Sequence, residues 1–168
     1  MPDTSSFLHG ARHRVRSATP ADAEAIAALK VHAWRAAYAG LLPETELAAL
    51  DAADEAAAWR EYLEAMPADE RLWVAVSGGR VVGYARTDPG ELHGLYVDPE
   101  LIGAGVGRAL FEHAVDDLRA RGARSVAVWH FAGNERAARF YERAGMRFVG
   151  DRRPSEHGAD EERWQLDL

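Results

Sequence analysis

The sequence predicts an α/β protein in which one mixed β-sheet carries helices on both faces. Three observations support this: short apolar runs of strand length, longer helical segments between them, and a glycine-rich loop joining a strand to a helix. The 168 residues suffice for one domain with a buried core. We assign that domain to residues 12–168 and expect residues 1–11, which show no periodicity, to form a flexible tail.

The first part of the chain is typical of one strand followed by helices. Residues 12–16 alternate in the manner of a strand. Thr19, Pro20 and Asp22 form a helix start, with an N-cap, a proline at the first position and an acid in the first turn. The expected helices end near Gly40, cover residues 44–50, and run from Asp51 to about Ala65.

The remaining segments supply most of the strands. Residues 71–86 form a hairpin pattern about the turn Gly78-Gly79. One helix follows Gly107 and ends before Gly122, and another runs from its cap Asn134 to Ala144. The expected strands are residues 71–77, 80–86, 91–97, 125–131, 146–150 and 162–168.

Composition narrows the functional classes. With 27 acidic and 20 basic side chains the formal charge is −7, which argues against a dedicated nucleic-acid binder. No apolar run is long enough for a membrane span and no signal-peptide core is present, so we expect a cytoplasmic protein without a membrane partner. The absence of cysteine excludes disulfides, thiolate metal sites and a catalytic thiol. The histidines are scattered, so no metal is expected.

The glycine-rich loop predicts an anion site. Backbone amides at a helix N-terminus point outward, and glycines let a phosphate approach the chain closely. The spacing fits neither the dinucleotide fingerprint nor the P-loop. It favours a pyrophosphate cradle, although a plain strand–helix turn is the alternative. The residues of this cradle are Gly103, Ala104, Gly105, Val106, Gly107 and Arg108, the last adding a cation.

Two segments resemble motifs of a known family. Residues 97–110 (VDPELIGAGVGRAL) resemble motif A of the GCN5-related N-acetyltransferase (GNAT) superfamily, and residues 134–146 (NERAARFYERAGM) resemble the motif that follows it. The order of elements is similar too, so the resemblance covers roughly residues 12–168 and implies a mostly antiparallel sheet of about seven strands. One departure is Ile102, which stands where the family usually has Gln or Arg.

The resemblance implies acetyl-CoA as donor and an amine, on a small molecule or a peptide, as acceptor. It implies that Leu95, Tyr96 and Val97 pair with the pantetheine arm through their backbone, and that the Val97 N–H polarises the thioester carbonyl. Asn134 would bind near the pantetheine arm, and Tyr141 would protonate the departing thiolate. Without a cysteine, the acetyl group would pass directly to the amine in a ternary complex. A homodimer is compatible with the family.

Physical reasoning supports Tyr141 independently. Asn134 and Tyr141 are seven residues apart and share a helix face. A phenol with a reference pKa of about 10 is a suitable acid for a thiolate whose conjugate acid has a pKa of about 8.5. The alternatives are a core aromatic for Tyr141 and a simple N-cap for Asn134.

The general base stays open between Glu91, His93 and ordered water. Glu91 matches the glutamate that serves as base in the histone-acetylating branch of the family, and an imidazole at His93 has a suitable pKa. A solvent-exposed acid at a strand end is the alternative for Glu91.

The acceptor pocket is expected to involve Trp34, Tyr38 and Trp129. Trp34 and Tyr38 are four residues apart on one helix face, although core packing explains them equally well. Trp129 and His130 are adjacent in a strand, so at most one is expected to line the cleft. The rival functions are a non-catalytic acyl-CoA-binding or sensing domain, and a transferase that uses a different acyl-CoA.

Overall fold

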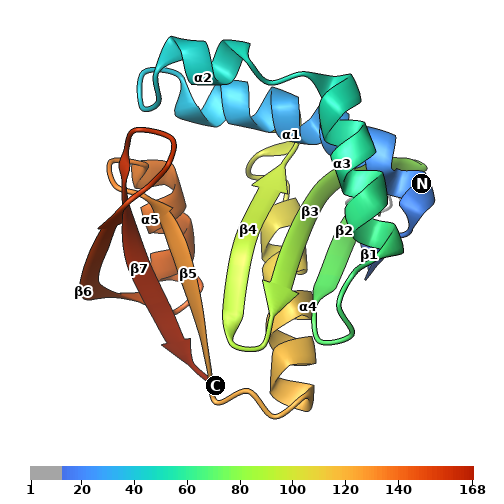
Figure 1. The fold of residues 1–168 in the computed structure, drawn as a ribbon. Coiled ribbons are helices and arrows are strands. Elements are labelled where there is room, and N and C mark those ends of the chain that lie inside the picture. The colour runs from blue at the N-terminus through green and yellow to red at the C-terminus, as the bar shows by residue number, and fades with distance from the viewer. Residues whose placement is uncertain (1–12) are drawn as a thin grey trace, which may run out of the picture.

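The computed structural model describes residues 13–168 and shows one seven-stranded sheet flanked by helices (Figure 1). The predicted tail and Arg12 lie outside the described residues. The strands follow the order β1-β2-β3-β4-β5-β7-β6, and neighbours are antiparallel except β4 and β5. Their bounds are β1 (Arg14–Ser17), β2 (Arg71–Ser77), β3 (Arg80–Asp88), β4 (Glu91–Val97), β5 (Ser125–Phe131), β6 (Arg147–Pro154) and β7 (Asp160–Asp167). The predicted α/β class and mixed sheet are confirmed.

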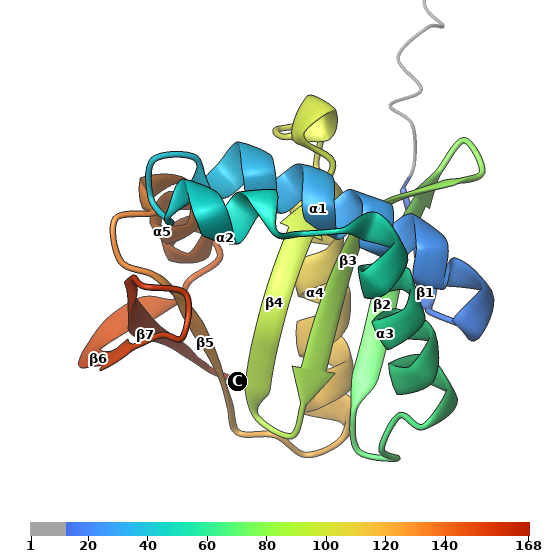
Figure 2. The same cartoon turned by 45° about the horizontal axis from the view of Figure 1, so that its top comes forward.

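The helices divide between the two faces of the sheet, as Figure 2 shows: α1 and α3 cover one face of β2, β3 and β4, and α4 covers the other. The first predicted helix begins as a 3-10 turn, η1, before α1. The helical bounds are η1 (Pro20–Asp22), α1 (Ala23–Tyr38), α2 (Glu44–Ala48), α3 (Ala52–Glu64), η2 (Pro99–Leu101), α4 (Val106–Ala120) and α5 (Glu135–Arg143).

The main core lies between the sheet and α4. Apolar residues of α4 recur at spacings of three and four, so one stripe of the helix faces the sheet. Leu110, Ala114 and Leu118 on this stripe are buried in one cluster with Val82 and Ala85 of β3. Burying one such large apolar side chain contributes about 1.5–3 kcal/mol, which fixes α4 and the loop at its N-terminus on the sheet.

The last hairpin extends further than the sequence predicts. β6 continues to Pro154 instead of ending at Gly150, and β7 begins at Asp160 instead of Glu162. The added residues pair across the strands through Arg152–Glu162 and Arg153–Glu161, each with N···O of 2.7 Å. Because these strand ends are charged, they lack the apolar alternation that predicts a strand.

The sheet splits between β4 and β5. The two strands pair only at Glu91↔Ala127 and Leu92↔Val128, and beyond this point they separate (Figure 1). On its other side β4 carries a bulge, because Gly94 pairs with Arg86 and Leu92 with Thr87, which leaves His93 as the extra residue. A bulge bends its strand and increases its twist, and this turns β4 away from β5.

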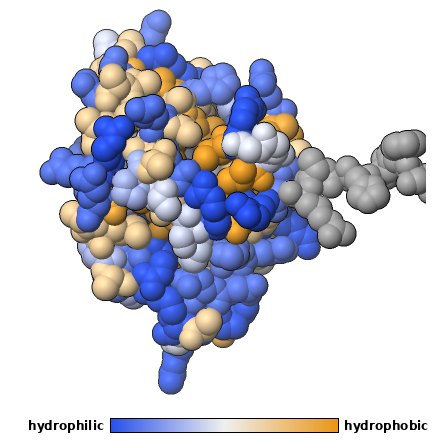
Figure 3. Space-filling view, turned by 90° about the vertical axis from the view of Figure 1, so that its right-hand side faces the viewer, coloured by the Kyte–Doolittle hydropathy of each residue, from blue (hydrophilic) through white to orange (hydrophobic). Residues whose placement is uncertain are grey.

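The surface, the helices and the titratable side chains add three observations. Hydrophilic side chains are interspersed with small apolar groups over the face at the right of Figure 1, which Figure 3 brings to the front. Within residues 13–168, no helix is both long and apolar enough to cross a membrane. The same residues hold no group of three His, Cys, Asp or Glu side chains arranged to bind a metal ion.

Candidate active site

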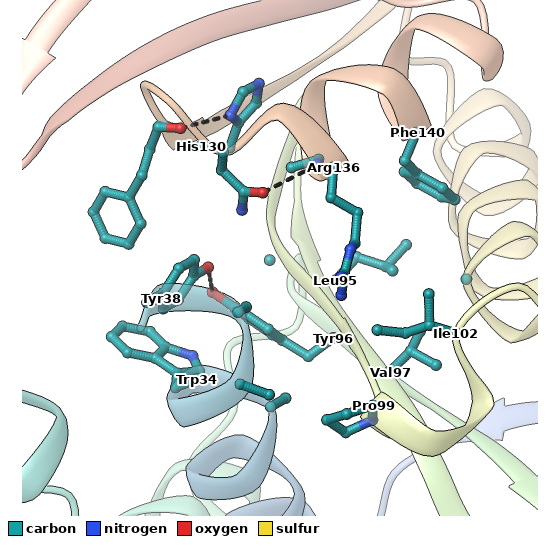
Figure 4. Close-up of a pocket in the computed structure, with 18 of the residues that line it drawn as sticks. Trp34, Tyr38, Leu95, Tyr96, Val97, Pro99, Ile102, His130, Arg136 and Phe140 are labelled. Carbon is teal, nitrogen blue, oxygen red and sulfur yellow. Dashed lines mark hydrogen bonds between the residues drawn. The ribbon is translucent and has the colours of Figure 1, made fainter. Parts of the chain in front are cut away.

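A cavity of about 800 Å³ lies at the split between β4 and β5 (Figure 4). Its walls come from α1, β4, the loop after β4, β5, α5 and the β6–β7 loop. This volume is typical of a small-molecule or cofactor site. The residues predicted from the sequence that line it are Trp34, Tyr38, His93, Leu95, Tyr96, Val97, Gly103, Gly105, Gly107, Arg108, Trp129, Asn134 and Tyr141.

The glycine-rich loop forms one end of this cavity. Gly103 and Gly105 have φ values of 85° and 87°, a left-handed conformation that residues with a Cβ rarely adopt. Gly105 is the N-cap of α4. Because an α-helix leaves its first amides without intrahelical acceptors, the N–H groups of Val106, Gly107 and Arg108 can donate to an anion.

Two of the predicted cradle residues do not line the cavity. Val106 is 1% exposed and packs in the core, so it does not border the cavity. Ala104 is exposed outside the cavity, and its carbonyl oxygen lies 2.9 Å from Nε2 of His13. This contact ties the loop to the residue before β1.

The free edge of β4 forms a second wall. Asp98 N donates to Val82 O of β3 at 2.9 Å. Backbone groups along an extended strand alternate between its two edges, so the N–H and C=O groups of Leu95 and Val97 point away from β3. β5 has already separated at this level, so the edge is open to an added extended ligand.

Tyr141 lies on α5 and is 5% exposed. Burial raises the pKa of Tyr141 above its ordinary value, with a further contribution from Tyr96. The phenol therefore keeps its proton at neutral pH. Asn134 is the N-cap of α5, where its Oδ1 accepts from Ala137 N at 3.1 Å. The N-cap alternative for Asn134 is thus present, and its amide NH₂ retains donors for a ligand.

His130 and Trp129 both line the cavity, so the expectation that at most one does is wrong. The cavity occupies the split beside β5, so consecutive residues of this strand border it. His130 stacks on Tyr141 with ring centroids 5.7 Å apart. Arg153 lies over the Trp129 ring, with its guanidinium carbon 4.1 Å from the ring centroid.

His93, the bulged residue, lies between two carboxylates. Its Nε2 is 2.5 Å from Asp88 Oδ2, and its Nδ1 is 3.6 Å from Glu91 Oε1. His93 lines the cavity, whereas Glu91 does not. Glu91 is instead in the paired part of β4, where the register with Ala127 closes the split.

Aromatic rings form the wall opposite the glycine loop. Trp34 packs edge-on against Tyr38, with ring centroids 5.1 Å apart, and against His157, with ring centroids 5.3 Å apart. Tyr38 packs against Phe131 at 4.9 Å, and its hydroxyl lies 3.3 Å from the hydroxyl of Tyr96 (Figure 4). We call Trp34, Tyr38, Tyr96, Phe131 and His157 the aromatic wall. Core packing and cavity lining thus coexist for Trp34 and Tyr38.

Sequence reasoning missed three residues of this region. Phe131 and His157 belong to the aromatic wall, and Glu161 lines the cavity beside them. Glu161 pairs with Phe131 across β7 and β5, and its Oε2 accepts from Arg153 Nε at 2.7 Å. His157 and Glu161 come from the β6–β7 hairpin, whose position over the cavity follows only from the strand order.

The sequence is similar to those of known proteins. An uncharacterised N-acetyltransferase of Methanocaldococcus jannaschii is 31% identical over 89 residues, which cover 46% of this chain and 39% of the relative. The [ribosomal protein bS18]-alanine N-acetyltransferase of Escherichia coli is 32% identical over 94 residues, covering 52% and 64%. The chain thus spans less than two thirds of either relative.

The fold is similar to that of solved N-acetyltransferases. The PaiA N-acetyltransferase of Thermoplasma acidophilum, crystallised with coenzyme A, superposes with a TM-score of 0.77 at 15% identity, covering 94% of this chain and 99% of that one. A profile of the acetyltransferase (GNAT) family matches residues 31–146, more than half of the sequence. With the glycine loop, the split sheet and the α5 motif in place, this chain belongs to the GNAT acetyltransferase family.

Proposed function

We propose that this protein transfers an acetyl group from acetyl-CoA to a primary amine by direct attack in a ternary complex. The observation that carries the proposal is one cavity that joins the glycine loop, the free edge of β4 and the buried phenol of Tyr141. Family membership and relatives named N-acetyltransferases support it.

The residues present fit acetyl-CoA. The amides of Val106, Gly107 and Arg108 can donate to its pyrophosphate. The open groups of Leu95 and Val97 can pair with the amides of its pantetheine arm, as an added strand would. When bound, acetyl-CoA supplies an activated thioester. The Val97 N–H would then donate to the thioester oxygen as negative charge develops there.

Tyr141 is the proposed general acid. As the amine nitrogen forms its bond to the acetyl carbon, the carbon–sulfur bond breaks and the sulfur gains negative charge. The phenol of Tyr141 donates its proton to this sulfur. Since the chain has no cysteine, no acetyl-cysteine intermediate is available and the amine attacks the thioester itself.

The proton lost by the amine passes to the imidazole of His93, directly or through water. His93 borders the cavity, while Asp88 and Glu91 flank its ring and stabilise the imidazolium that forms. Glu91 acts here through His93 or water because it does not border the cavity. The aromatic wall and Trp129 cover the acceptor.

A first test replaces Tyr141 with Phe. Loss of the acid is expected to lower kcat on the order of 10²-fold, while the Kd for acetyl-CoA stays unchanged. Thiol release with a panel of amines, amino acids, polyamines and peptides identifies the acceptor and measures kcat, and calorimetry measures Kd. An unchanged kcat removes Tyr141 as the acid.

Tyr84→Phe is the matched control. Tyr84 is also a buried tyrosine, but it does not line the cavity and its hydroxyl has no hydrogen-bond partner within residues 13–168. Its loss is expected to leave kcat unchanged. Acetyl-CoA binding without thiol release for any amine would favour the acyl-CoA sensing alternative. Thiol release only with another acyl-CoA would instead identify that acyl-CoA as the donor.

A further inference from the structure

Two arginines near the glycine loop, Arg108 and Arg136, differ in whether their charge is free to bind an anion. Arg108 follows the last glycine of the loop, but its Nε lies 2.7 Å from Glu112 Oε1, and both side chains are exposed. This pair offsets part of the Arg108 charge. Ile102, 48% exposed beside the loop, offers neither charge nor hydrogen-bond donor.

Arg136 has no such neutralising partner. It lies in the first turn of α5, and its side chain extends into the cavity toward Leu95, across from Ile102 (Figure 4). Among the residues that the structure describes, none forms an ion pair or hydrogen bond with its guanidinium, whereas Arg139, on the same helix, binds Glu135 at 3.3 Å. Arg136 therefore directs five unused N–H donors toward the cavity.

The chemistry of this position suits a phosphate. A guanidinium matches two oxygens of a phosphate with parallel hydrogen bonds, and such charge-assisted bonds are stronger than neutral ones. Leu95, Val97 and Phe140 border the same part of the cavity, and Arg136 itself is exposed. The chain as a whole carries a charge of −7, so binding an anion depends on local cations.

We propose that Arg136 binds the pyrophosphate of the acyl-CoA donor from α5, opposite the backbone amides of α4, and supplies the cation that Ile102 does not. This inference rests on the proposed use of an acyl-CoA. It makes the donor site a clamp between two helices: α4 contributes amides and α5 contributes the guanidinium. The adenosine 3′-phosphate is the competing partner, and the experiment separates the two.

The experiment measures Kd by calorimetry for coenzyme A, 3′-dephospho-coenzyme A and pantetheine. Arg136→Ala is expected to raise the Kd for coenzyme A and for its dephospho form equally, on the order of tenfold or more. The Kd for pantetheine should stay unchanged. The matched control Arg139→Ala should change none of the three. Ile102→Arg in the Arg136→Ala background should recover affinity for both nucleotides.

The outcomes separate this inference from the proposed function. If wild-type protein binds no coenzyme A, both fail. If it binds but Arg136→Ala binds equally well, the Arg136 inference alone is overturned. A loss seen for coenzyme A but absent for the dephospho form would assign Arg136 to the 3′-phosphate and overturn the pyrophosphate assignment. A loss for pantetheine as well would show a general packing defect and overturn the inference too.

Discussion

Two carboxylates close together in the sequence show how burial changes the contribution of a residue to stability. Asp22 is 7% exposed and accepts from Arg16 Nη1 at 2.7 Å, Arg16 Nη2 at 2.8 Å and Thr19 N at 2.8 Å. Glu24, two positions on, is exposed and meets Arg60 at 3.3 Å. Bonds held in a partly buried site stabilise a fold more than a solvated surface pair does.

Asp22→Asn is therefore expected to lower the free energy of unfolding by about 1–3 kcal/mol at neutral pH. The hydrogen bonds from Arg16, and secondarily Thr19, lower the pKa of Asp22 in the folded state. Its stabilising contribution is thus present above the unfolded pKa of about 4 and is lost as pH falls through the lower folded value. The variant should show less acid sensitivity in that window.

Urea unfolding at neutral pH and at several acidic pH values measures both effects. Glu24→Gln is the control, because an exposed pair contributes about 0–1 kcal/mol. If the two variants lose the same free energy of unfolding and show the same pH dependence, the buried Asp22–Arg16 pair contributes no more to stability than the exposed pair.

The sequence brings together the proposed catalytic residues more directly than the residues of the proposed acceptor side. Asn134 and Tyr141 belong to one short helix, so their spacing alone places them together. Trp34 and Tyr38 are likewise one turn apart. Phe131 and Glu161 meet only because β7 pairs with β5, a contact between distant segments that no local pattern encodes.

At the scale of elements, helix and strand order follow from periodicity, but the split in the sheet does not. Apolar residues of β4 lie on both sides of the point where β5 departs, Leu92 before it and Leu95 to Val97 after it, so the apolar pattern does not mark the end of pairing. The bulge at His93 depends on register with β3, which is a property of two strands together. The active-site opening is thus a tertiary feature of elements that are individually predictable.

Gly83 shows how closely α4 approaches the sheet. A Cβ there would lie 2.8 Å from Leu110 Cδ1, 3.0 Å from Val106 Cγ1 and 3.0 Å from the Tyr96 carbonyl oxygen. Gly83→Ala is expected to cost about 1–3 kcal/mol through overpacking. Because Val106 begins α4 at the glycine loop, acetyl-CoA affinity should fall as well.

Chemical unfolding and calorimetry check the two parts of this prediction. In a double-variant cycle, Leu110→Ala removes the shortest contact, so the combined loss should be smaller than the sum of the single losses. Strict additivity, or a Gly83→Ala variant as stable as wild type, would show that α4 can shift without cost.

At the scale of the molecule, β4 and β5 join the two parts of the sheet through two registered pairs. The α4 core spans this junction, since Leu110 and Leu118 share a cluster with Val126, Val128 and, from α5, Tyr141. A ligand in the split would contact β4, α4 and α5 together. Its binding should therefore stabilise the whole fold and order the edges of the split most.

The prediction is a thermal shift with a defined location. A ligand at a hundred times its Kd stabilises the folded state by about 2.7 kcal/mol. For a chain of this size, each kcal/mol raises Tm by roughly 2–4 °C, so acetyl-CoA should raise it by roughly 5–10 °C.

Hydrogen exchange should slow at residues 94–97, at the glycine loop and in the first turn of α5, and change little in β1 and α3. Pantetheine, which lacks the phosphates, should protect the β4 edge without protecting the loop. A full thermal shift with no added protection at residues 94–97 would place the ligand outside the split.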